Sequence, residues 1–307
     1  MFDILFNTFT YLLIIAIGYL LKKIKLVGPG AAETCMALVL NLTLPCLLIN
    51  SSAGVALSAG MLVYLALGVI VNLISLLANF LVNRKKETPL MTAVTMLSGS
   101  GIDVGDFVLP FIKTFFPGTG LMDLVIFNIG NTVMNSGGNY AIAAKVSASG
   151  RKFGIKDILK KLFSSVAFDA YLLIIFMAVT GLPWPERFLQ VTGVIGDANI
   201  FLVMIMIGLK LEFHVEKEER PIMLKILSVR FAIAFLMTIV TLLLPIPTLA
   251  KVVLTAAYFG PPSSTANVFS RNLGYKDSLV SQVNVICIFT AMAIITAIMM
   301  VGQNLAY

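Results

Sequence analysis

Apolar segments separated by short polar connections fill almost the whole chain. A helix needs roughly 20 predominantly apolar residues to cross a bilayer. The pattern therefore predicts an all-α membrane protein with ten transmembrane helices. The predicted spans are 2–21, 31–50, 59–81, 90–112, 120–145, 162–180, 188–210, 222–244, 249–272 and 279–303.

Two of the predicted spans are interrupted by residues that break helices. The fourth span contains glycines and two aspartates over 98–110, and the ninth contains a glycine and two prolines, then hydroxyl residues, over 260–267. Irregular backbone at membrane depth is tolerated only where protein or a water-filled cavity satisfies its hydrogen bonds. Interrupted spans at corresponding positions of two halves are typical of the binding site of a secondary transporter.

The longest polar connection divides the chain into two sets of five spans. We expect a first five-helix repeat at 1–146, a central cytoplasmic loop at 147–161 and a second five-helix repeat at 162–307. Because five is odd, the second set must lie upside down relative to the first, as in the inverted repeats of many transporters. The broken helices four and nine are then expected to cross in antiparallel directions.

Composition agrees with a polytopic membrane protein. Apolar residues make up 59% of the chain and charged residues 12%, and the mean hydropathy is +0.97, whereas charged residues form about a quarter of a soluble domain. The net charge of +7 does not indicate nucleic-acid binding, because the basic residues occur in short loop clusters. The expected partners are the lipid bilayer and a small solute, with no nucleic acid.

The distribution of basic residues predicts the topology in the cell membrane. When alternate loops are assigned to alternate sides, all but four of the 22 lysines and arginines fall on one side, the exceptions being Lys113, Arg187, Lys251 and the intramembrane Arg230. The positive-inside rule makes that side cytoplasmic, so both termini are expected to be extracytoplasmic. The three cysteines are far apart inside predicted helices, a spacing that predicts neither a disulfide framework nor a metal site.

Polar residues of the fourth span are the first candidates for chemistry. Gly101 and Gly105 permit non-helical dihedrals and close approach, and Pro110 removes a backbone donor. Asp103 and Asp106 lie at a depth where a carboxylate is costly unless it is paired, hydrated or protonated. Three roles are open to these aspartates: binding a coupling cation, carrying a proton, or pairing with a basic side chain on another helix. The sequence favours neither of the first two roles over the other. We assign the glycines and the proline to substrate binding and the aspartates to the coupling ion.

The ninth span offers a second set of polar groups next to a break. Proline is favoured in the first turn of a helix, and Ser and Thr supply short donors, so these residues are expected to line the start of a second half-helix and to suit an anionic or polar ligand. The alternative is a kinked helix whose hydroxyls bond back to their own carbonyls. The candidates are Pro261, Pro262, Ser263, Ser264, Thr265 and Asn267.

Asparagines recur along one face of the fifth span, at Asn128, Asn131, Asn135 and Asn139. Four amides facing lipid are costly, so the stripe is expected to face the interior, either as interhelical hydrogen bonds or as a cavity wall. Asn131 and Asn135 are assigned to the substrate site. For Arg230, the alternatives are snorkelling to the interface, a pair with Asp169, or contact with a substrate carboxylate.

The chain resembles the auxin efflux carrier family over its full length. Residues 41–45 (Asn-Leu-Thr-Leu-Pro) resemble the family's Asn-Leu-Pro pattern in span two. Residues 208–211 resemble the family's glycine-containing end of span seven. Residues 261–266 resemble the proline and small-residue segment with which the family's second crossing helix resumes. The chain departs from the family at Asp103, where asparagine is usual, and at Val108, where glycine is usual.

The resemblance implies a scaffold of spans one, two, six and seven, against which a transport unit of spans three to five and eight to ten moves. It also implies organic anions as substrates, such as malate, malonate or indole-3-acetate. Bile acid sodium symporters share a related crossed-helix architecture in which cations bind near the crossover. On this resemblance we expect no cofactor beyond coupling to Na⁺ or H⁺.

The sequence therefore predicts a secondary active transporter of small organic anions, either malate-like dicarboxylates or aromatic carboxylates, and not an enzyme. The sequence does not decide the oligomeric state, monomer or homodimer, or the direction of transport, import or export. One alternative is an intramembrane aspartyl protease, because 103–106 (Asp-Val-Gly-Asp) approaches the Gly-x-Gly-Asp pattern, with Asp169 as the second aspartate. Another is a ligand sensor or channel on a carrier fold. The chain has no P-loop, so a gradient is expected to drive transport.

Overall fold

The computed structural model describes residues 2–54, 58–147, 154–212 and 219–306. All regular structure in these ranges is helical, as predicted. Six helical segments are long and apolar enough to cross a membrane, and a bent pair at 155–180 makes a seventh candidate. The other predicted spans are divided among shorter helices. Helix length alone therefore identifies fewer membrane-spanning helices than the ten that the sequence predicts.

Shorter helices lie between the long segments, some of them at the two predicted breaks. The second predicted span, where no interruption was predicted, also contains a π-helical turn just before Pro45. The elements are α1 (Phe2–Lys23), α2 (Ala31–Leu38), η1 (Val39–Thr43), α3 (Leu44–Ser52), η2 (Ala59–Met61), α4 (Leu62–Asn83), α5 (Pro89–Gly99), η3 (Val104–Val108), α6 (Leu109–Phe115), α7 (Thr119–Val133), η4 (Met134–Gly138), α8 (Asn139–Val146), α9 (Ile155–Leu162), α10 (Val166–Thr180), α11 (Glu186–Lys210), α12 (Arg220–Leu243), α13 (Thr248–Tyr258), α14 (Thr265–Asn272) and α15 (Leu279–Ala306).

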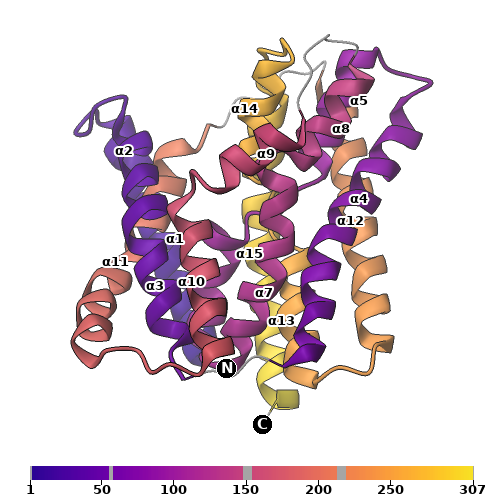
Figure 1. Cartoon of the computed structure of the whole chain (residues 1–307). Helices are drawn as coiled ribbons and strands as arrows, with labels where there is room; N and C mark the ends of the chain where they lie inside the picture. Colours follow the sequence, from indigo (N-terminus) through magenta and orange to yellow (C-terminus); the bar gives the residue numbers. More distant parts are fainter. Residues whose placement is uncertain (1, 55–57, 148–153, 213–218, 307) are drawn as a thin grey trace.

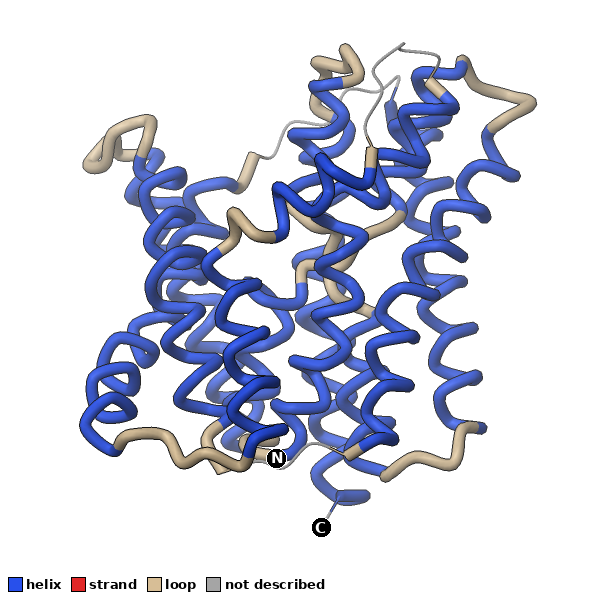
Figure 2. Tube along the Cα trace, in the orientation of Figure 1, coloured by secondary structure: helices blue, strands red, loops and turns tan. Residues whose placement is uncertain are grey.

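Both predicted interruptions are confirmed. After α5 the backbone is extended at Ser100 and has a φ of +68° at Gly101, a conformation that favours glycine. The chain returns to a helical path in η3 and α6. In the ninth span, α13 ends at Tyr258 and α14 begins at Thr265, with Pro261 between them. Figure 2 shows this non-helical chain crossing the interior of the molecule, apart from the loops at its two ends.

The helices form two bundles that lie side by side (Figure 1). In the first bundle, α11 packs against α1, α2 and α3, and α3 also packs against α10. In the second bundle, α4 packs against α5, α7 and α12, while α13 packs against α7, α12 and α15. Both interrupted helices belong to the second bundle. The beginning of α1 and the end of α15 lie at the same end of the molecule.

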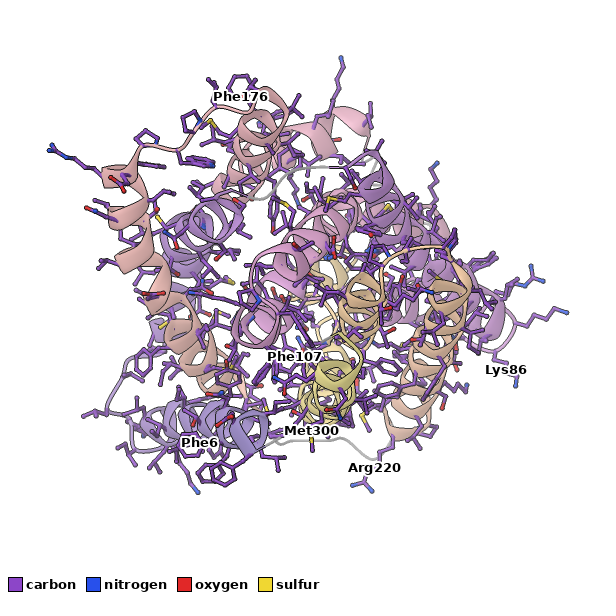
Figure 3. The ribbon with its side chains drawn as sticks, turned by 90° about the horizontal axis from the view of Figure 1, so that it is seen from below. Phe6, Lys86, Phe107, Phe176, Arg220 and Met300 are labelled. Carbon is purple, nitrogen blue, oxygen red and sulfur yellow. The ribbon has the colours of Figure 1, made fainter. Side chains whose placement is uncertain are left out.

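Large apolar side chains cover the outside of the bundles as well as their interior. In Figure 3, Phe6 and Phe176 lie at the periphery and Phe107 lies near the centre. Their exposed fractions are 59%, 55% and 1%, respectively. An apolar outer surface of this kind is expected where lipid, rather than water, surrounds the helices.

The predicted central loop is partly helical. Residues 148–153 lie outside the described residues, but α9 occupies 155–162 and meets α10 at an angle of 79°. One side of α9 is buried at Leu162, while Lys156 and Lys160 are exposed. This helix has eight residues, four of them charged, and is therefore too short and too polar to be predicted as a span.

Candidate binding site at two interrupted helices

The two interruptions meet inside the second bundle. The backbone N–H of Asp103 donates a hydrogen bond of 2.9 Å to the carbonyl oxygen of Pro261. A Cβ atom added at Gly101 would lie 3.4 Å from Cβ of Ser263. Segments that are about 160 residues apart in the sequence are therefore in direct contact, and we call this region the crossover.

Asparagine side chains satisfy the backbone that the first break leaves without helical partners. Gly101 donates its N–H to Oδ1 of Asn72 over 2.9 Å. The carbonyl oxygen of Ile102 accepts from Nδ2 of Asn131 at 2.8 Å and from Nδ2 of Asn135 at 3.0 Å, and the Ile102 N–H donates to Oδ1 of Asn131 at 3.3 Å. Of the two readings of the asparagine stripe, the structure supports interhelical hydrogen bonds.

The same amides are also bonded to one another. Asn139 donates to Oδ1 of Asn72 over 2.9 Å, and Asn72 donates to Oδ1 of Asn131 over 3.1 Å. Asn131 donates to Asn128 over 2.9 Å, and Asn128 donates over 2.6 Å to the hydroxyl of Tyr171, which belongs to the first bundle. This chain of amides links the first break to the interface between the bundles.

Asn72 is a member of the site that the sequence analysis did not identify. It is 1% exposed and supports the first break from α4. A signal was present, because Asn72, Ser75 and Asn79 recur on one face of the predicted third span and Asn83 continues the same spacing two residues beyond its predicted end, in the same way as the stripe on the fifth. All four are buried.

Asp103 and Asp106 lie at the start of the half-helix that follows the first break. Oδ1 of Asp103 accepts a 3.3 Å hydrogen bond from the N–H of Asp106, so the Asp103 side chain caps the start of η3. Asp106 is 6% exposed, and its Oδ1 accepts no hydrogen bond within the described part of the chain. A buried carboxylate oxygen without a donor is costly unless a cation or a proton meets it.

This half-helix faces the first bundle. A Cβ atom added at Gly105 would lie 3.3 Å from Cδ2 of Leu44 in α3. Asp103 and Asp106 flank Gly105 in the sequence, so the half-helix that carries the aspartates lies at the border between the two bundles.

The second break places hydroxyl groups at the start of α14. Pro261, Pro262 and Ser263 are buried, and Ser264 is half-buried. The Ser263 and Thr265 hydroxyls are 3.0 Å apart, and the N–H of Thr265 donates to Oγ of Ser263 over 3.4 Å. These residues line the first turn of a half-helix, as predicted. The hydroxyls bond locally and do not bond back along a continuous kinked helix.

Two predicted site residues have other contacts. Oδ1 of Asn267 accepts a 3.1 Å bond from Ser281 and so connects α14 to α15. Pro110 lies in the first turn of α6, and its carbonyl accepts a 2.9 Å bond from Thr114. These positions shape the ends of the half-helices and are not brought together with Asn131 and Ser263.

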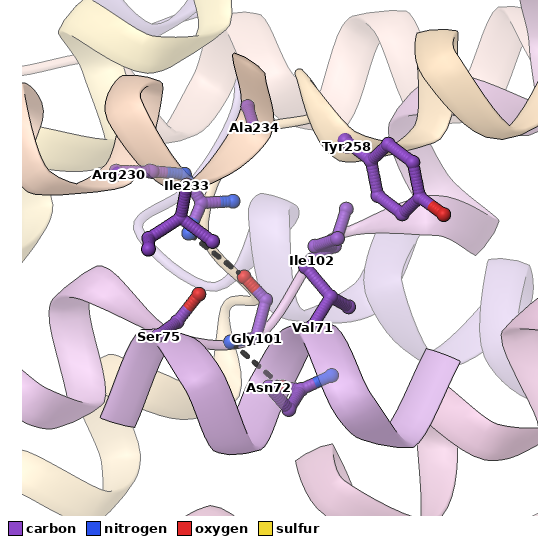
Figure 4. A pocket seen from close by; sticks show the side chains of 9 residues that line it. All are labelled: Val71, Asn72, Ser75, Gly101, Ile102, Arg230, Ile233, Ala234 and Tyr258. Carbon is purple, nitrogen blue, oxygen red and sulfur yellow. Dashed lines mark hydrogen bonds between the residues drawn. The ribbon is translucent and has the colours of Figure 1, made fainter. Parts of the chain in front are cut away.

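Arg230 comes from the middle of α12, is 6% exposed and contacts both breaks. Its Nη2 donates to the carbonyl of Gly260 over 2.6 Å. Its Nη1 lies 3.2 Å, 3.4 Å and 3.0 Å from the carbonyl oxygens of Gly99, Ser100 and Gly101. Figure 4 shows the guanidinium above Gly101.

Two of the alternatives considered for Arg230, snorkelling to the membrane interface and a pair with Asp169, differ from these contacts. Asp169 is exposed in the first turn of α10, and no described hydrogen bond or ion pair joins it to Arg230 or to Asp106. An aspartyl protease needs two aspartates that share one site. A buried Asp106 and an exposed Asp169 do not form such a pair.

The chain matches no model of a known protein family and no curated protein. Within the described ranges, no group of three or more His, Cys, Asp or Glu side chains is placed to hold a metal ion. Functional assignment therefore depends on the geometry of the crossover.

Proposed function

We propose that the protein is a secondary active transporter that moves small organic anions, malate-like dicarboxylates or aromatic carboxylates, across the cell membrane by alternating access. The observation that carries this proposal is the buried contact between two interrupted helices, made through the Asp103 N–H and the Pro261 carbonyl. Irregular backbone in the middle of a membrane protein is expected where it forms a ligand site.

The arrangement of the helices supports two inverted repeats with ten membrane crossings. In Figure 1, α5 and α14 lie at one end of the molecule and α13 lies at the other, so the two broken helices run in opposite directions. Counting α5 with α6, α7 with α8, and α13 with α14 as single crossings gives the ten spans. The loop at 84–86, rich in basic residues, is then cytoplasmic and both termini are extracytoplasmic.

An anion would bind at the N-terminal ends of the two later half-helices, η3 with α6 and α14. Helix N-termini carry partial positive charge and free N–H groups. The hydroxyls of Ser263 and Thr265 add donors on one side of the crossover, and the amide of Asn135 lies on the other.

Movement of the second bundle against the first would expose this site to each side of the membrane in turn. The site lies at the border between the bundles, where Asn128 bonds Tyr171 and Gly105 approaches Leu44. Asp103 and Asp106 would bind the coupling cation, Na⁺ or H⁺, because a carboxylate oxygen of Asp106 has no donor. This is the division into scaffold and transport unit that the family resemblance implied.

Flux measurements with the purified protein test the proposal. Proteoliposomes would be loaded with malate, malonate or an indole carboxylate, and counterflow of the labelled anion would be followed under an imposed pH or sodium gradient. We expect saturable flux that needs the gradient and is absent from empty liposomes. Gly101→Val should abolish flux, because φ at this position is +68°, while Gly28→Val, in open space, should not. Absence of flux for all anions under both gradients would refute the proposal.

A further inference from the structure

The C-terminal ends of the two earlier half-helices converge on one side of the crossover. Gly99 is the last residue of α5, and Gly260 follows the end of α13 by two residues. The carbonyl oxygens of Gly99, Ser100, Gly101 and Gly260 all lie within 3.4 Å of the Arg230 guanidinium. We call this set of oxygens the carbonyl face.

The carbonyl face is a cation site by its chemistry. The last carbonyls of a helix lack intrahelical partners and carry the negative end of the helix dipole, and here two helices direct such ends at one point. Clustered backbone carbonyls and half-helix C-termini coordinate alkali cations in membrane proteins. Without a cation at this point, these buried oxygens would repel one another and lack donors.

Arg230 supplies that cation from within the chain. It is buried, and none of the ion pairs within the described residues includes it. A buried guanidinium needs hydrogen-bonding partners to offset its lost hydration. The carbonyl face provides them.

A small cavity lies beside the guanidinium. It has a volume of about 10 Å³ and is lined by Asn72, Ser75, Gly101, Tyr258 and neighbouring apolar side chains (Figure 4). A space of this size holds about one water molecule. A shorter, uncharged side chain at position 230 would enlarge it enough to admit a small hydrated cation next to the carbonyl face.

We infer that Arg230 is a resident cation that permanently fills a monovalent-cation site formed by the two helix C-termini. The carbonyl face therefore requires no metal ion. In the proposed transport cycle, on which this last step rests, the coupling ion is confined to Asp103 and Asp106. Removal of the guanidinium should convert the carbonyl face into a site for an exchangeable cation.

Thermal unfolding of the purified protein in detergent tests this inference. Arg230→Met and Arg230→Gln would be purified and melted in chloride salts of Na⁺, K⁺, Li⁺ or choline at equal ionic strength, and in choline with 10 mM guanidinium added. We expect the variants to melt below the wild type in choline, and at least one small cation or guanidinium to raise their melting temperature by about 3 °C or more beyond its effect on the wild type. Arg220→Met, on an exposed arginine of the same helix, should gain no such response.

The result that would overturn the inference is a variant at position 230 that gains no cation-specific stabilisation over the wild type. Failure of both variants to fold in every one of these salts would overturn it as well, because an added cation should replace the missing one. The melting experiment does not depend on transport. Absence of anion flux together with a gained cation response would reject the proposed function and leave the resident cation in place.

Discussion

The side chain of Asn131 illustrates how single residues hold the crossover together. It is 1% exposed, and its amide contacts the backbone N–H and C=O of Ile102 as well as the amides of Asn72 and Asn128. A side-chain amide has both donors and acceptors. It can therefore replace the two helical partners that the break removes from the backbone of one residue, Ile102.

Replacement of Asn131 by leucine should destabilise the protein by about 2 kcal/mol, because the buried N–H of Ile102 loses its acceptor while the carbonyl keeps Asn135. Thermal or denaturant-induced unfolding in detergent measures the loss. Asn41→Leu is the matched control, since Asn41 is exposed and bonds only its own helix at Ala37. Equal stability of the two variants would contradict the role of Asn131.

Neutralising the aspartates should change ion coupling without unfolding the protein. In Asp103→Asn, the amide oxygen still accepts from the N–H of Asp106, so the cap of η3 is kept. The dependence of flux on sodium or pH should weaken in this variant and disappear in the double variant with Asp106→Asn. Flux of the double variant at two pH values, with and without sodium, measures this. An unchanged response would show that the carboxylates are structural.

Residue types were easier to predict than their partners. The asparagine stripe and the intramembrane aspartates stand out in the sequence because polar groups in apolar spans need a reason to be there. The contacts of Arg230 could not be predicted, because its partners are main-chain oxygens that leave no trace in residue identity. Asn72 was not predicted although its stripe was visible, because it lies on a continuous helix and its partner at the break, the N–H of Gly101, is a main-chain group.

At the scale of elements, proline and glycine located both interruptions correctly, since proline removes a backbone donor and glycine permits non-helical dihedrals. What the pattern did not predict is the division of span five by the π-helical turn η4, or the helix α9 in the central connection. η4 contains Gly137, whose φ is +151°, and Gly138, so a glycine signal was present there and was not used. The eight residues of α9 include four charged ones, so no apolar run marks this helix.

The double change of Pro261 and Pro262 to alanine should leave an inserted protein with impaired flux. Alanine restores the backbone donors and favours continuous helix from α13 into α14, which would withdraw the Pro261 carbonyl from Asp103. Expression and melting temperature report insertion, and anion flux reports function. Pro221→Ala is the control, because Pro221 lies in the first turn of α12, where proline is not required to break a helix. Flux at the level of the control would count against the break as the site.

At the scale of the whole molecule, the two bundles are joined by polar contacts in the half where α1 begins. The Tyr11 hydroxyl is 2.7 Å from that of Thr114, and Lys113 forms an ion pair of 3.0 Å with Asp197. These contacts run from α1 and α11 to α6, that is, from the first bundle to the half-helix that carries the aspartates. Relative movement of the bundles would have to break them.

Both ends of the chain should be accessible from outside the cell. In a variant without the three native cysteines, a cysteine at the exposed position 3 should react with an impermeant maleimide in intact cells, because the basic loops place the opposite end in the cytoplasm. A cysteine at the exposed position 156, in α9, should react only after permeabilisation. The reverse labelling pattern would invert the topology.

The contacts of Arg230 with peptide oxygens also have a genetic consequence. A salt bridge between two side chains can be lost and then recovered by exchanging the charges of the partners, but Gly99, Ser100 and Gly260 contribute no side-chain atom to this contact. No second substitution at these positions can therefore compensate for the loss of Arg230. Suppressors of such a loss should instead introduce a new basic side chain on a helix that faces the same oxygens, such as α4 at Ser75.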